Sequence, residues 1–324
     1  MTILQTLMGL VILLLGGDFL VRGAVAFAQR IHLPPLVIGL TVVAFVTSAP
    51  ELMVSIKAAL GGTPDIALGN VIGSNIANIL LVLGVPSLLY PTICNSPMLR
   101  RNTAFAIVVS LVFITFSLTG TLTFWNGAVL TILLLAFVGY SALVDRSVPA
   151  VTAEMASEVE HHTYKGMTAG QSFLFIVGGL AGLLVGAKLL VDGAVAVAQA
   201  AGVSEAVIGL TLVAVGTSVP ELVTALVAAV RRHSDVVVGT VLGSCIFNLA
   251  GVMGVTALVT NIPVSAGFIH FDLLVMLAAL VLLVPFIFTR TSIGRWSGGL
   301  YLTIYGAYTL ALFFGYSAVN MAMD

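Results

Sequence analysis

The feature that most constrains this chain is a duplicated motif that places a carboxylate inside an apolar segment. Glu51 lies in segment 39–52, and Glu221 lies in the matching segment 209–222, 170 residues later. The two copies align without a gap and share the core Thr-Ser-x-Pro-Glu. Placing a charged side chain in a bilayer costs at least about 2.5 kcal/mol, so an acidic residue there is by default functional. The sequence therefore predicts that the two glutamates belong to one site.

The repeat extends beyond this motif. Gly69-x-Val-x-Gly-Ser-x-Ile-x-Asn78 is matched at the same offset by Gly239-x-Val-x-Gly-Ser-x-Ile-x-Asn248. Self-similarity at a fixed offset indicates a duplicated chain with one motif pair in each half. The predicted organisation is a first repeat over 1–144 with its motif at 39–84, a cytoplasmic linker over 145–170, and a second repeat over 171–324 with its motif at 209–254.

Composition places nearly the whole chain in a membrane. Of 324 residues, 60% are hydrophobic and 8% are charged, and the mean hydropathy is +1.18. A chain of this kind is a polytopic helical membrane protein. The net charge of −1 and the dispersed basic residues argue against a nucleic-acid partner. Two cysteines, Cys94 and Cys245, form neither a disulfide framework nor a metal-thiolate spacing.

Apolar stretches of about 20 residues are long enough to cross a bilayer as helices. Ten such stretches occur near 3–27, 35–60, 66–90, 102–119, 123–144, 171–198, 204–230, 235–259, 269–289 and 297–317. Because each half holds an odd number of spans, the second half must enter the membrane from the opposite face. We therefore expect an all-α polytopic membrane protein whose ten transmembrane helices form two inverted five-helix repeats.

The basic residues predict the orientation of these spans. Ten of the twelve gather at one set of loops: Arg22, Arg30, Arg100, Arg101, Arg146, Lys165, Arg231, Arg232, Arg290 and Arg295. Lys57 and Lys188 fall on the other set. Because cytoplasmic loops carry an excess of Lys and Arg, both termini are expected outside the cytoplasm, in a multi-pass protein of the cell inner (plasma) membrane.

Proline in each motif predicts a break in the helix. Pro50 disturbs the hydrogen bonding around Val46 and Thr47, and Pro220 acts in the same way in the second copy. Freed carbonyls within a membrane are tolerated where they line a cavity or meet an ion, so both breaks are candidate cation ligands. Thr47 stands four residues before Glu51, which places hydroxyl, carbonyl and carboxylate oxygens on one face.

The following segments add neutral oxygens to these carboxylates. Ser74 and Asn78 are four residues apart, and Ser244 and Asn248 repeat the spacing. A set of carboxylates and neutral oxygens without thiolate or imidazole suits calcium, which takes 6–8 oxygen ligands, better than a soft transition metal. Two glutamates also balance one divalent or two monovalent cations, whereas an empty site would leave two like charges desolvated. We therefore expect obligatory exchange of one cation for another.

At these residues the chain resembles the cation/calcium antiporter superfamily, specifically its prokaryotic sodium/calcium exchanger branch. The resemblance covers essentially the whole chain, and its specific parts are Thr47-Ser-Ala-Pro-Glu51, Gly73-Ser-Asn-Ile-Ala-Asn78, Gly216-Thr-Ser-Val-Pro-Glu221 and Gly243-Ser-Cys-Ile-Phe-Asn248.

The resemblance implies a ligand set and a mechanism. Calcium would be held by Glu51, Glu221 and the carbonyls of Thr47 and Thr217. Flanking sodium sites would use Ala44, Ser48, Ser74, Ala214, Ser218 and Ser244. Asn78 and Asn248, whose spacing repeats beside the two glutamate motifs, are further sodium or supporting candidates. Transport would follow alternating access, with the first and sixth helices sliding across the site, in a chain that acts as a monomer without a cofactor and is not an enzyme.

Two positions depart from the family pattern. Val46 stands where the motif usually has glycine, which the second copy keeps as Gly216, so the first break should be less flexible. Asn248 stands where some relatives carry aspartate, which removes a third carboxylate and argues against potassium co-transport.

Four other interpretations compete with a sodium/calcium antiporter. A proton/cation antiporter of the same architecture would need only the carboxylates, whereas the neutral oxygens beside them favour sodium. A structural, proton-sharing glutamate pair is at odds with a motif that weakens its helices. An intramembrane hydrolase lacks a His-Glu-x-x-His site. A channel would not require inverted internal copies, whereas access from two sides does.

Overall fold

The computed structural model describes residues 2–30, 43–144, 167–200 and 214–321. Two of the predicted spans, 35–60 and 204–230, begin outside these ranges. The predicted linker over 145–170 also lies outside them up to residue 166.

The first half of the chain is a series of helices interrupted by two short strands. In order, the described elements are α1 (Thr2–Arg30), α3 (Ala44–Thr47), α4 (Ala49–Leu60), α5 (Pro64–Ala77), the π-helix η2 (Asn78–Val82), α6 (Gly84–Leu89), β1 (Thr92–Ile93), α7 (Pro97–Ser117), β2 (Thr121–Leu122) and α8 (Phe124–Val144).

The second half follows the same order. Its described elements are α10 (Ala169–Ala200), α12 (Ala214–Thr217), α13 (Val219–Val230), α14 (Ser234–Ile246), the π-helix η5 (Phe247–Val252), α15 (Met253–Val259), β3 (Ile262–Pro263), the π-helix η6 (Phe268–Asp272), α16 (Leu273–Thr289), β4 (Ser292–Ile293) and α17 (Arg295–Met321).

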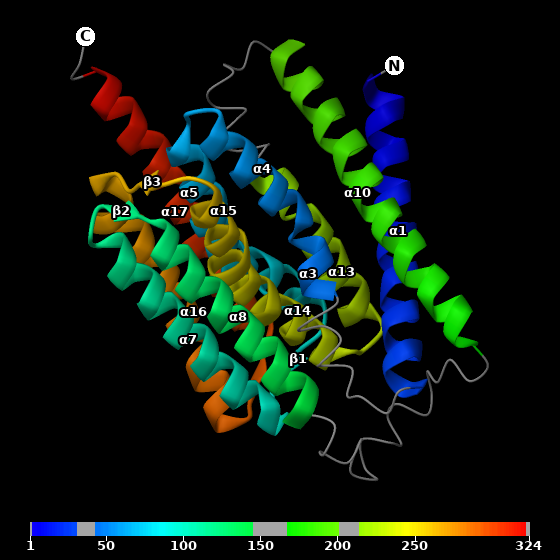
Figure 1. Ribbon diagram of the computed structural model, residues 1–324. Coiled ribbons are helices and arrows are strands. Elements are labelled where there is room, and N and C mark those ends of the chain that lie inside the picture. The colour runs from blue at the N-terminus through cyan, green and yellow to red at the C-terminus, as the bar shows by residue number, and fades with distance from the viewer. Residues whose placement is uncertain (1, 31–42, 145–166, 201–213, 322–324) are drawn as a thin grey trace.

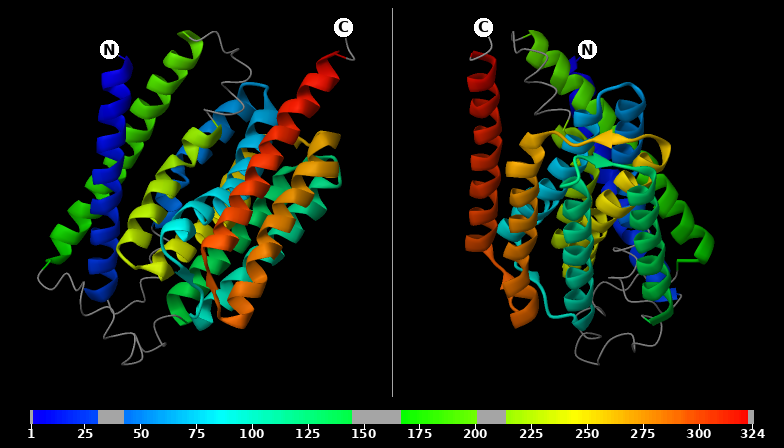
Figure 2. Two further views of the ribbon diagram at one scale, coloured as in Figure 1. Left: turned by 180° about the vertical axis from the view of Figure 1, so that it is seen from behind. Right: turned by 60° about the vertical axis from the view of Figure 1, so that its left-hand side comes forward.

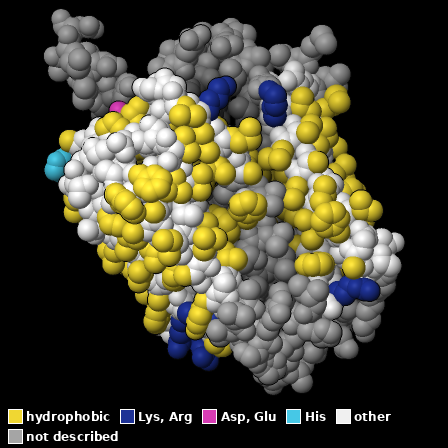
Figure 3. Space-filling model, viewed as in Figure 1, with side chains coloured by type: hydrophobic (Ala, Val, Ile, Leu, Met, Phe, Trp, Pro, Cys, Tyr) yellow, Lys and Arg dark blue, Asp and Glu magenta, His cyan; other side chains and the backbone are white. Residues whose placement is uncertain are grey.

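Long apolar helices dominate the described chain. Seven of them are long and apolar enough to cross a membrane: Leu7–Phe27, Pro64–Leu89, Pro97–Ser117, Phe124–Ser141, Ala169–Gly186, Ser234–Val259 and Phe268–Thr289. The prediction of a polytopic helical membrane protein is therefore confirmed. Figure 3 agrees with this conclusion, because apolar side chains cover the middle of the visible face and the Lys and Arg side chains lie toward its two ends.

Local sequence explains where several helices begin and end. α5 and α7 each start with a proline, Pro64 and Pro97, at the first turn, where the missing N–H has no helical partner in any case. The chain turns after α7 at Gly120, whose φ of +81° suits glycine. These local signals account for the starts of α5 and α7 and for the turn after α7.

The centre of the molecule is formed by two equivalent stacks of helices. One runs through α5, η2 and α6, and the other through α14, η5 and α15; they are the two most buried of the candidate spans. Ile72, Ile76, Leu242 and Ile246 belong to the main hydrophobic cluster around them. These stacks form the scaffold against which the helices of the site pack.

Two strand pairs tie the halves together at their loops. β1 pairs antiparallel with β4, placing Thr92 opposite Ile293, and β2 pairs with β3, placing Thr121 opposite Pro263. The sequence did not predict these strands, because each has two residues and its partner lies far away in the chain. β1 and β3 occupy equivalent places in the two halves, as do β2 and β4. Each strand pair therefore joins one strand of the first half to one strand of the second half.

α1 and α10 lie side by side at one edge of the molecule (Figures 1 and 2). Their contact is made by glycines: a Cβ added at Gly16 would lie 2.7 Å from the Leu183 amide nitrogen, and one added at Gly179 would overlap the backbone of Leu20. Small residues allow this close backbone approach, which is a common way for membrane helices to associate.

We expect Gly179→Ala to lower the unfolding temperature of the detergent-solubilised protein. The new methyl group would meet the α1 backbone, and overpacking of this kind costs about 1–3 kcal/mol. The neighbouring Gly178→Ala is the matched control, because a Cβ there would meet no atom of the described residues within 4 Å. It should leave the unfolding temperature unchanged or raise it, since alanine favours helix by up to about 1 kcal/mol. Equal effects of the two changes would contradict the close α1–α10 contact.

Candidate cation site

The first motif forms a broken helix. α3 ends at Thr47, Ser48 leaves the helical conformation with φ −83° and ψ 4°, and α4 begins at Ala49. Across this break the described backbone bonds run from the Ser48 amide to the Ala44 carbonyl, at 3.0 Å, and from the Leu52 amide to the Ser48 carbonyl, at 3.2 Å. Since Pro50 has no N–H, it offers nothing to the Val46 carbonyl, so the predicted interruption is present.

The second motif breaks in the same way. α12 ends at Thr217, Ser218 has φ −88° and ψ 3°, and α13 begins at Val219. The Ser218 amide bonds to the Val215 carbonyl at 3.1 Å, and Pro220 cannot donate to the carbonyl of Gly216. The two copies therefore adopt nearly identical local conformations, although one has valine and the other glycine before the threonine.

Each break is followed within one turn by a fully buried glutamate. Glu51 and Glu221 are 0% exposed, and Glu51 lies close enough to Glu221 to interact electrostatically with it. Among the described residues, no group satisfies hydrogen-bond geometry to any of the four carboxylate oxygens. Buried charges are normally paired or bound to metal, so a pair without such partners is a strong candidate for a cation site.

Several expected ligands lie around this pair. Ser74 faces Glu51, and Thr47 and Ser48 face Glu221 from the other half of the chain. The Ser218 and Ser74 hydroxyls are 3.4 Å apart, which joins the second break to α5. The structure thus brings together groups separated by more than 140 residues.

Ser244, Asn78 and Asn248 extend the set of buried polar groups along the central stacks. All three are at most 1% exposed, and none of their side-chain polar atoms has a hydrogen-bond partner in the described part of the chain. Asn78 begins η2, and Asn248 is the second residue of η5. π-Helical segments are frequent at functional sites, and here they occur at matching places in both halves.

The two expected alanine positions are described less fully. Ala44 is buried at the start of α3, and its carbonyl accepts the Ser48 amide. Ala214 begins α12, and its side chain lies outside the described residues. Both stand at the start of the short helix that precedes each break.

The sequence analysis did not identify Asn70 and Thr240 as residues of the site. Each lies on a central stack one helical turn before the serine of its half, and both are buried. The Asn70 amide bonds to Ser55 and to the Glu51 carbonyl, and its oxygen accepts the Thr217 hydroxyl. The signal was available, because the four-residue spacing from Ser74 to Asn78 continues back to Asn70.

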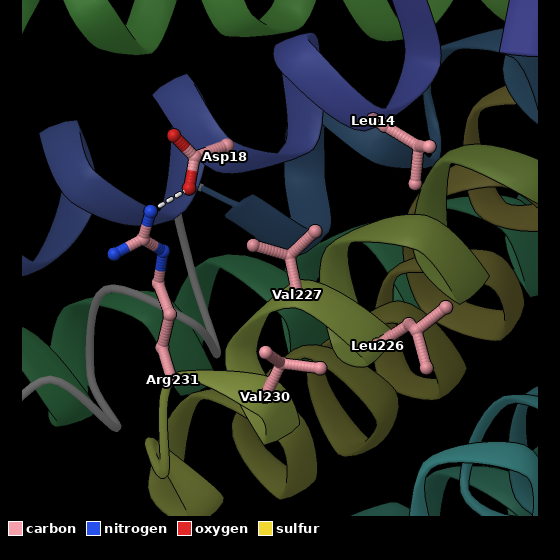
Figure 4. A pocket seen from close by; sticks show the side chains of 6 residues that line it. All are labelled: Leu14, Asp18, Leu226, Val227, Val230 and Arg231. Atoms are coloured by element: carbon pink, nitrogen blue, oxygen red, sulfur yellow. Dashed lines mark hydrogen bonds and ion pairs between the residues drawn. The ribbon is translucent and has the colours of Figure 1, made fainter. Parts of the chain in front are cut away.

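A separate pocket of about 500 Å³ lies between α1 and α13, away from the glutamates. Figure 4 shows that Asp18 of α1 reaches Arg231 at the end of α13, above Leu226, Val227 and Val230. Asp18 also pairs with Arg22 at 2.7 Å. This pocket has an apolar lining and one carboxylate already paired with arginines, so it lacks the oxygen ligands of a cation site.

The cysteines do not add a reactive group. Both are buried and free. Cys94 lies outside the membrane-spanning segments, where burial and then the charge of Asp235 raise the pKa of its thiol to about 12. Since the thiolate is the reactive form, Cys94 is poorly suited to redox chemistry or metal binding at neutral pH.

The donor set fits a hard cation. It combines two carboxylates with hydroxyl, amide and backbone carbonyl oxygens, and no cluster of His, Cys, Asp and Glu typical of a transition-metal site occurs among the described residues. Oxygen ligands of this kind suit calcium and other hard cations. The site is also formed by irregular backbone buried within protein, which is where a membrane protein tolerates it.

Comparison with known proteins places the chain in a transporter family. The family model described as sodium/calcium exchanger protein matches residues 1–143 and 171–314, so the chain belongs to this family, within the prokaryotic branch of the cation/calcium antiporter superfamily.

Individual relatives support the same placement. The chain is 39% identical to a protein of Alkalimonas amylolytica whose assignment as the antiporter CaxA is itself provisional, over 84% of this chain and 85% of that protein. It is 30% identical to the sodium/calcium exchanger MaX1 of Methanosarcina acetivorans, over 95% and 97% of the two chains. Among solved structures, the sodium-calcium exchanger NCX_Mj without sodium or calcium matches with a TM-score of 0.83 and 32% identity, over 96% and 98% of the two chains.

We expect Pro50→Ala to weaken cation binding. The new amide at position 50 can bond to the Val46 carbonyl and close the break, so the calcium concentration that gives half the maximal thermal stabilisation should rise about tenfold. Pro64→Ala is the control, because Pro64 occupies the first turn of α5, where the missing amide is tolerated. Unchanged calcium dependence in Pro50→Ala would show that the break does not contribute to binding.

Proposed function

We propose that this chain exchanges sodium for calcium across the membrane by alternating access. The observation that carries the proposal is the pair of buried carboxylates, Glu51 and Glu221, which meet across two broken helices without a described hydrogen-bond partner. Membership of the sodium/calcium exchanger family supports the same activity and identifies the chain as a transporter.

In this proposal calcium is held at the centre of the site. Glu51 and Glu221 supply its negative charge, and the carbonyls of Thr47 and Thr217 supply neutral oxygens at the ends of α3 and α12. Both carboxylates are required because calcium carries two charges. The interruption of each helix is required because a carbonyl within a regular helix is occupied by the amide four residues later.

Sodium uses the flanking oxygens. The proposed sodium or supporting positions are Ala44, Ser48, Ser74, Asn78, Ala214, Ser218, Ser244 and Asn248. The partnerless polar atoms of Ser48, Ser244 and the two asparagines support these assignments, because a bound ion or its water would satisfy them.

Charge explains why exchange should be obligatory. With calcium or two sodium ions bound, the two carboxylates are neutralised, and the loaded site can pass between its two faces. With no ion bound, two like charges remain desolvated and close together, which is strongly unfavourable. The empty carrier should therefore change its access slowly, so that calcium leaves only in return for sodium.

The proposed architecture has ten transmembrane helices in two inverted repeats, 1–144 and 171–324, joined by a cytoplasmic linker over 145–170. The repeated order of elements and the pairing of strands from different halves support it. α1 starts and α17 ends on the same side of the molecule (Figure 1). An even number of spans requires this arrangement, so it also supports the proposal.

We place the protein in the cell inner (plasma) membrane, with both termini outside the cytoplasm, and propose that it works as a monomer without a cofactor. Seven candidate spans and the bias of basic residues support this placement. Each proposed ligand comes from one chain, so the site needs no second copy.

The deciding experiment measures calcium uptake into proteoliposomes loaded with sodium. Three conditions are compared: an outward sodium gradient, an outward proton gradient and no gradient. We expect uptake only with the sodium gradient, and we expect Glu51→Gln or Glu221→Gln to reduce it at least about 100-fold, because each removes half of the balancing charge from a desolvated site.

Thr224→Val is a suitable control in the same helix as Glu221. Its hydroxyl is buried but bonds at 2.7 Å to the carbonyl of Pro220, so its loss changes local packing without removing a proposed ligand. It should retain sodium-driven uptake. Uptake driven only by protons would favour the proton/cation antiporter instead.

A further inference from the structure

Asn70 is a buried side chain that none of the proposed ligand assignments includes. It lies on α5, one turn before Ser74, and is 9% exposed. Its Nδ2 donates to the Glu51 carbonyl oxygen at 3.1 Å and to Ser55 Oγ at 3.0 Å. Its Oδ1 accepts the Thr217 hydroxyl at 3.3 Å. Both the NH₂ group and the oxygen of this amide therefore bond to the two broken helices.

The orientation of the Asn70 amide follows from its partners. The carbonyl of Glu51 can only accept, so the NH₂ group must face it, and this leaves the amide oxygen for the Thr217 hydroxyl, which can donate. Reversing the amide would place two acceptors against each other at Glu51. The network thus has one consistent arrangement.

This network joins the two halves of the proposed site. Glu51 lies in the first turn of α4, whereas Thr217 is the last residue of α12, and the Thr217–Asn70 bond spans 147 residues of sequence. A second hydrogen bond between the two motif regions joins Ser218 to Ser74 at 3.4 Å, and both of these serines are themselves proposed ligands. Asn70 differs because it holds two proposed ligands without being one.

Among the described residues of the second half, no matching connection is seen. Thr240 occupies the position equivalent to Asn70, and its hydroxyl has no hydrogen-bond partner in the described ranges. Thr47, the counterpart of Thr217, donates at 3.4 Å to Ala44 in its own helix. Ala225 stands where the first half has Ser55. In the described part of the chain, the connection through Asn70 is therefore a feature of the first half and not of the repeat.

We propose that Asn70 is a positioning residue that sets the separation between Glu51 and the Thr217 end of α12, and thereby tunes the calcium site. This role rests on the proposed function of the two glutamates. Asn70 bonds directly to Glu51 and Thr217, which are both proposed calcium ligands, and its described bonds reach none of the flanking sodium positions. Loss of Asn70 should therefore weaken calcium binding more than sodium binding.

The test compares Asn70→Ala with Thr217→Val, which removes the same hydrogen bond from its other end and keeps the Thr217 carbonyl. Each variant is reconstituted to measure half-saturating calcium and sodium, and calcium is also titrated against the unfolding temperature in detergent. We expect half-saturating calcium to rise about tenfold in both variants, because both lose the hydrogen bond between Asn70 and Thr217. In Asn70→Ala, half-saturating sodium and the maximal rate should stay within about threefold of wild type.

The double variant tests whether the bond itself matters. If Asn70 and Thr217 act through their contact, combining the changes should shift calcium half-saturation no further than the larger single change. Asn75→Ala is the matched control, because this buried asparagine on the same helix bonds at 2.7 Å to Val71 within its own helix. It should leave both ion affinities unchanged.

The outcomes separate this role from the proposed function. Unshifted calcium affinity in Asn70→Ala and Thr217→Val, an equal shift for calcium and sodium, or the same shift in Asn75→Ala would overturn the role of Asn70. If Asn70→Ala does not fold, Thr217→Val decides alone. A wild-type protein without sodium-driven uptake would count against the exchanger function, and the calcium titration of the unfolding temperature would still decide the role of Asn70.

Discussion

The structure depends on two carboxylates that are buried side by side. A single desolvated carboxylate is unfavourable, and a second one nearby adds repulsion. Glu51 and Glu221 have no hydrogen-bond partner among the described groups, so the surrounding fold does not relieve this cost by itself. A bound cation would relieve this cost, and the hydroxyls of Ser74, Thr47 and Ser48, which face the two glutamates, would add neutral oxygens to such a site.

Irregular backbone is concentrated around the same pair. Each glutamate follows a helix break at a serine, and each central stack changes from α- to π-helix at or next to an asparagine. A membrane interior tolerates free carbonyls only where protein or a polar site surrounds them, so these irregular segments require the regular helices that enclose them. The buried stacks α5–α6 and α14–α15 provide that enclosure.

The α1–α10 pair is joined to the site in a different way. Its two helices touch through glycines, with backbone against backbone, and α1 meets α13 through Gly17 beside Val223 and through the ion pair of Asp18 with Arg231. A glycine face is smooth and has few side chains to interlock. Backbone packing therefore holds α1 and α10 together, whereas side chains join α1 to α13.

Much of this protein could be predicted from its sequence, because the relevant signals are local. Apolar length indicated the helical membrane fold, the prolines marked both breaks, and the repeated Thr-Ser-x-Pro-Glu motif identified the two glutamates that the structure brings together. Assignments of Asn78 and Asn248 as ligands remain predictions, since the described contacts do not join them to a glutamate.

Tertiary structure alone decided the contacts between distant segments. Three examples are the hydrogen bond from Thr217 to Asn70, the pairing of β1 with β4 and of β2 with β3, and the ion pair of Asp18 with Arg231. Each depends on the distance between residues that are far apart in the chain. Periodicity and motif spacing carry no such distance. The sequence by itself determined which oxygens were available and that they came in two copies. Packing decided which of these oxygens meet. Among the described contacts, it brings Asn70 to Thr217 of the other half but gives the equivalent Thr240 hydroxyl no such partner.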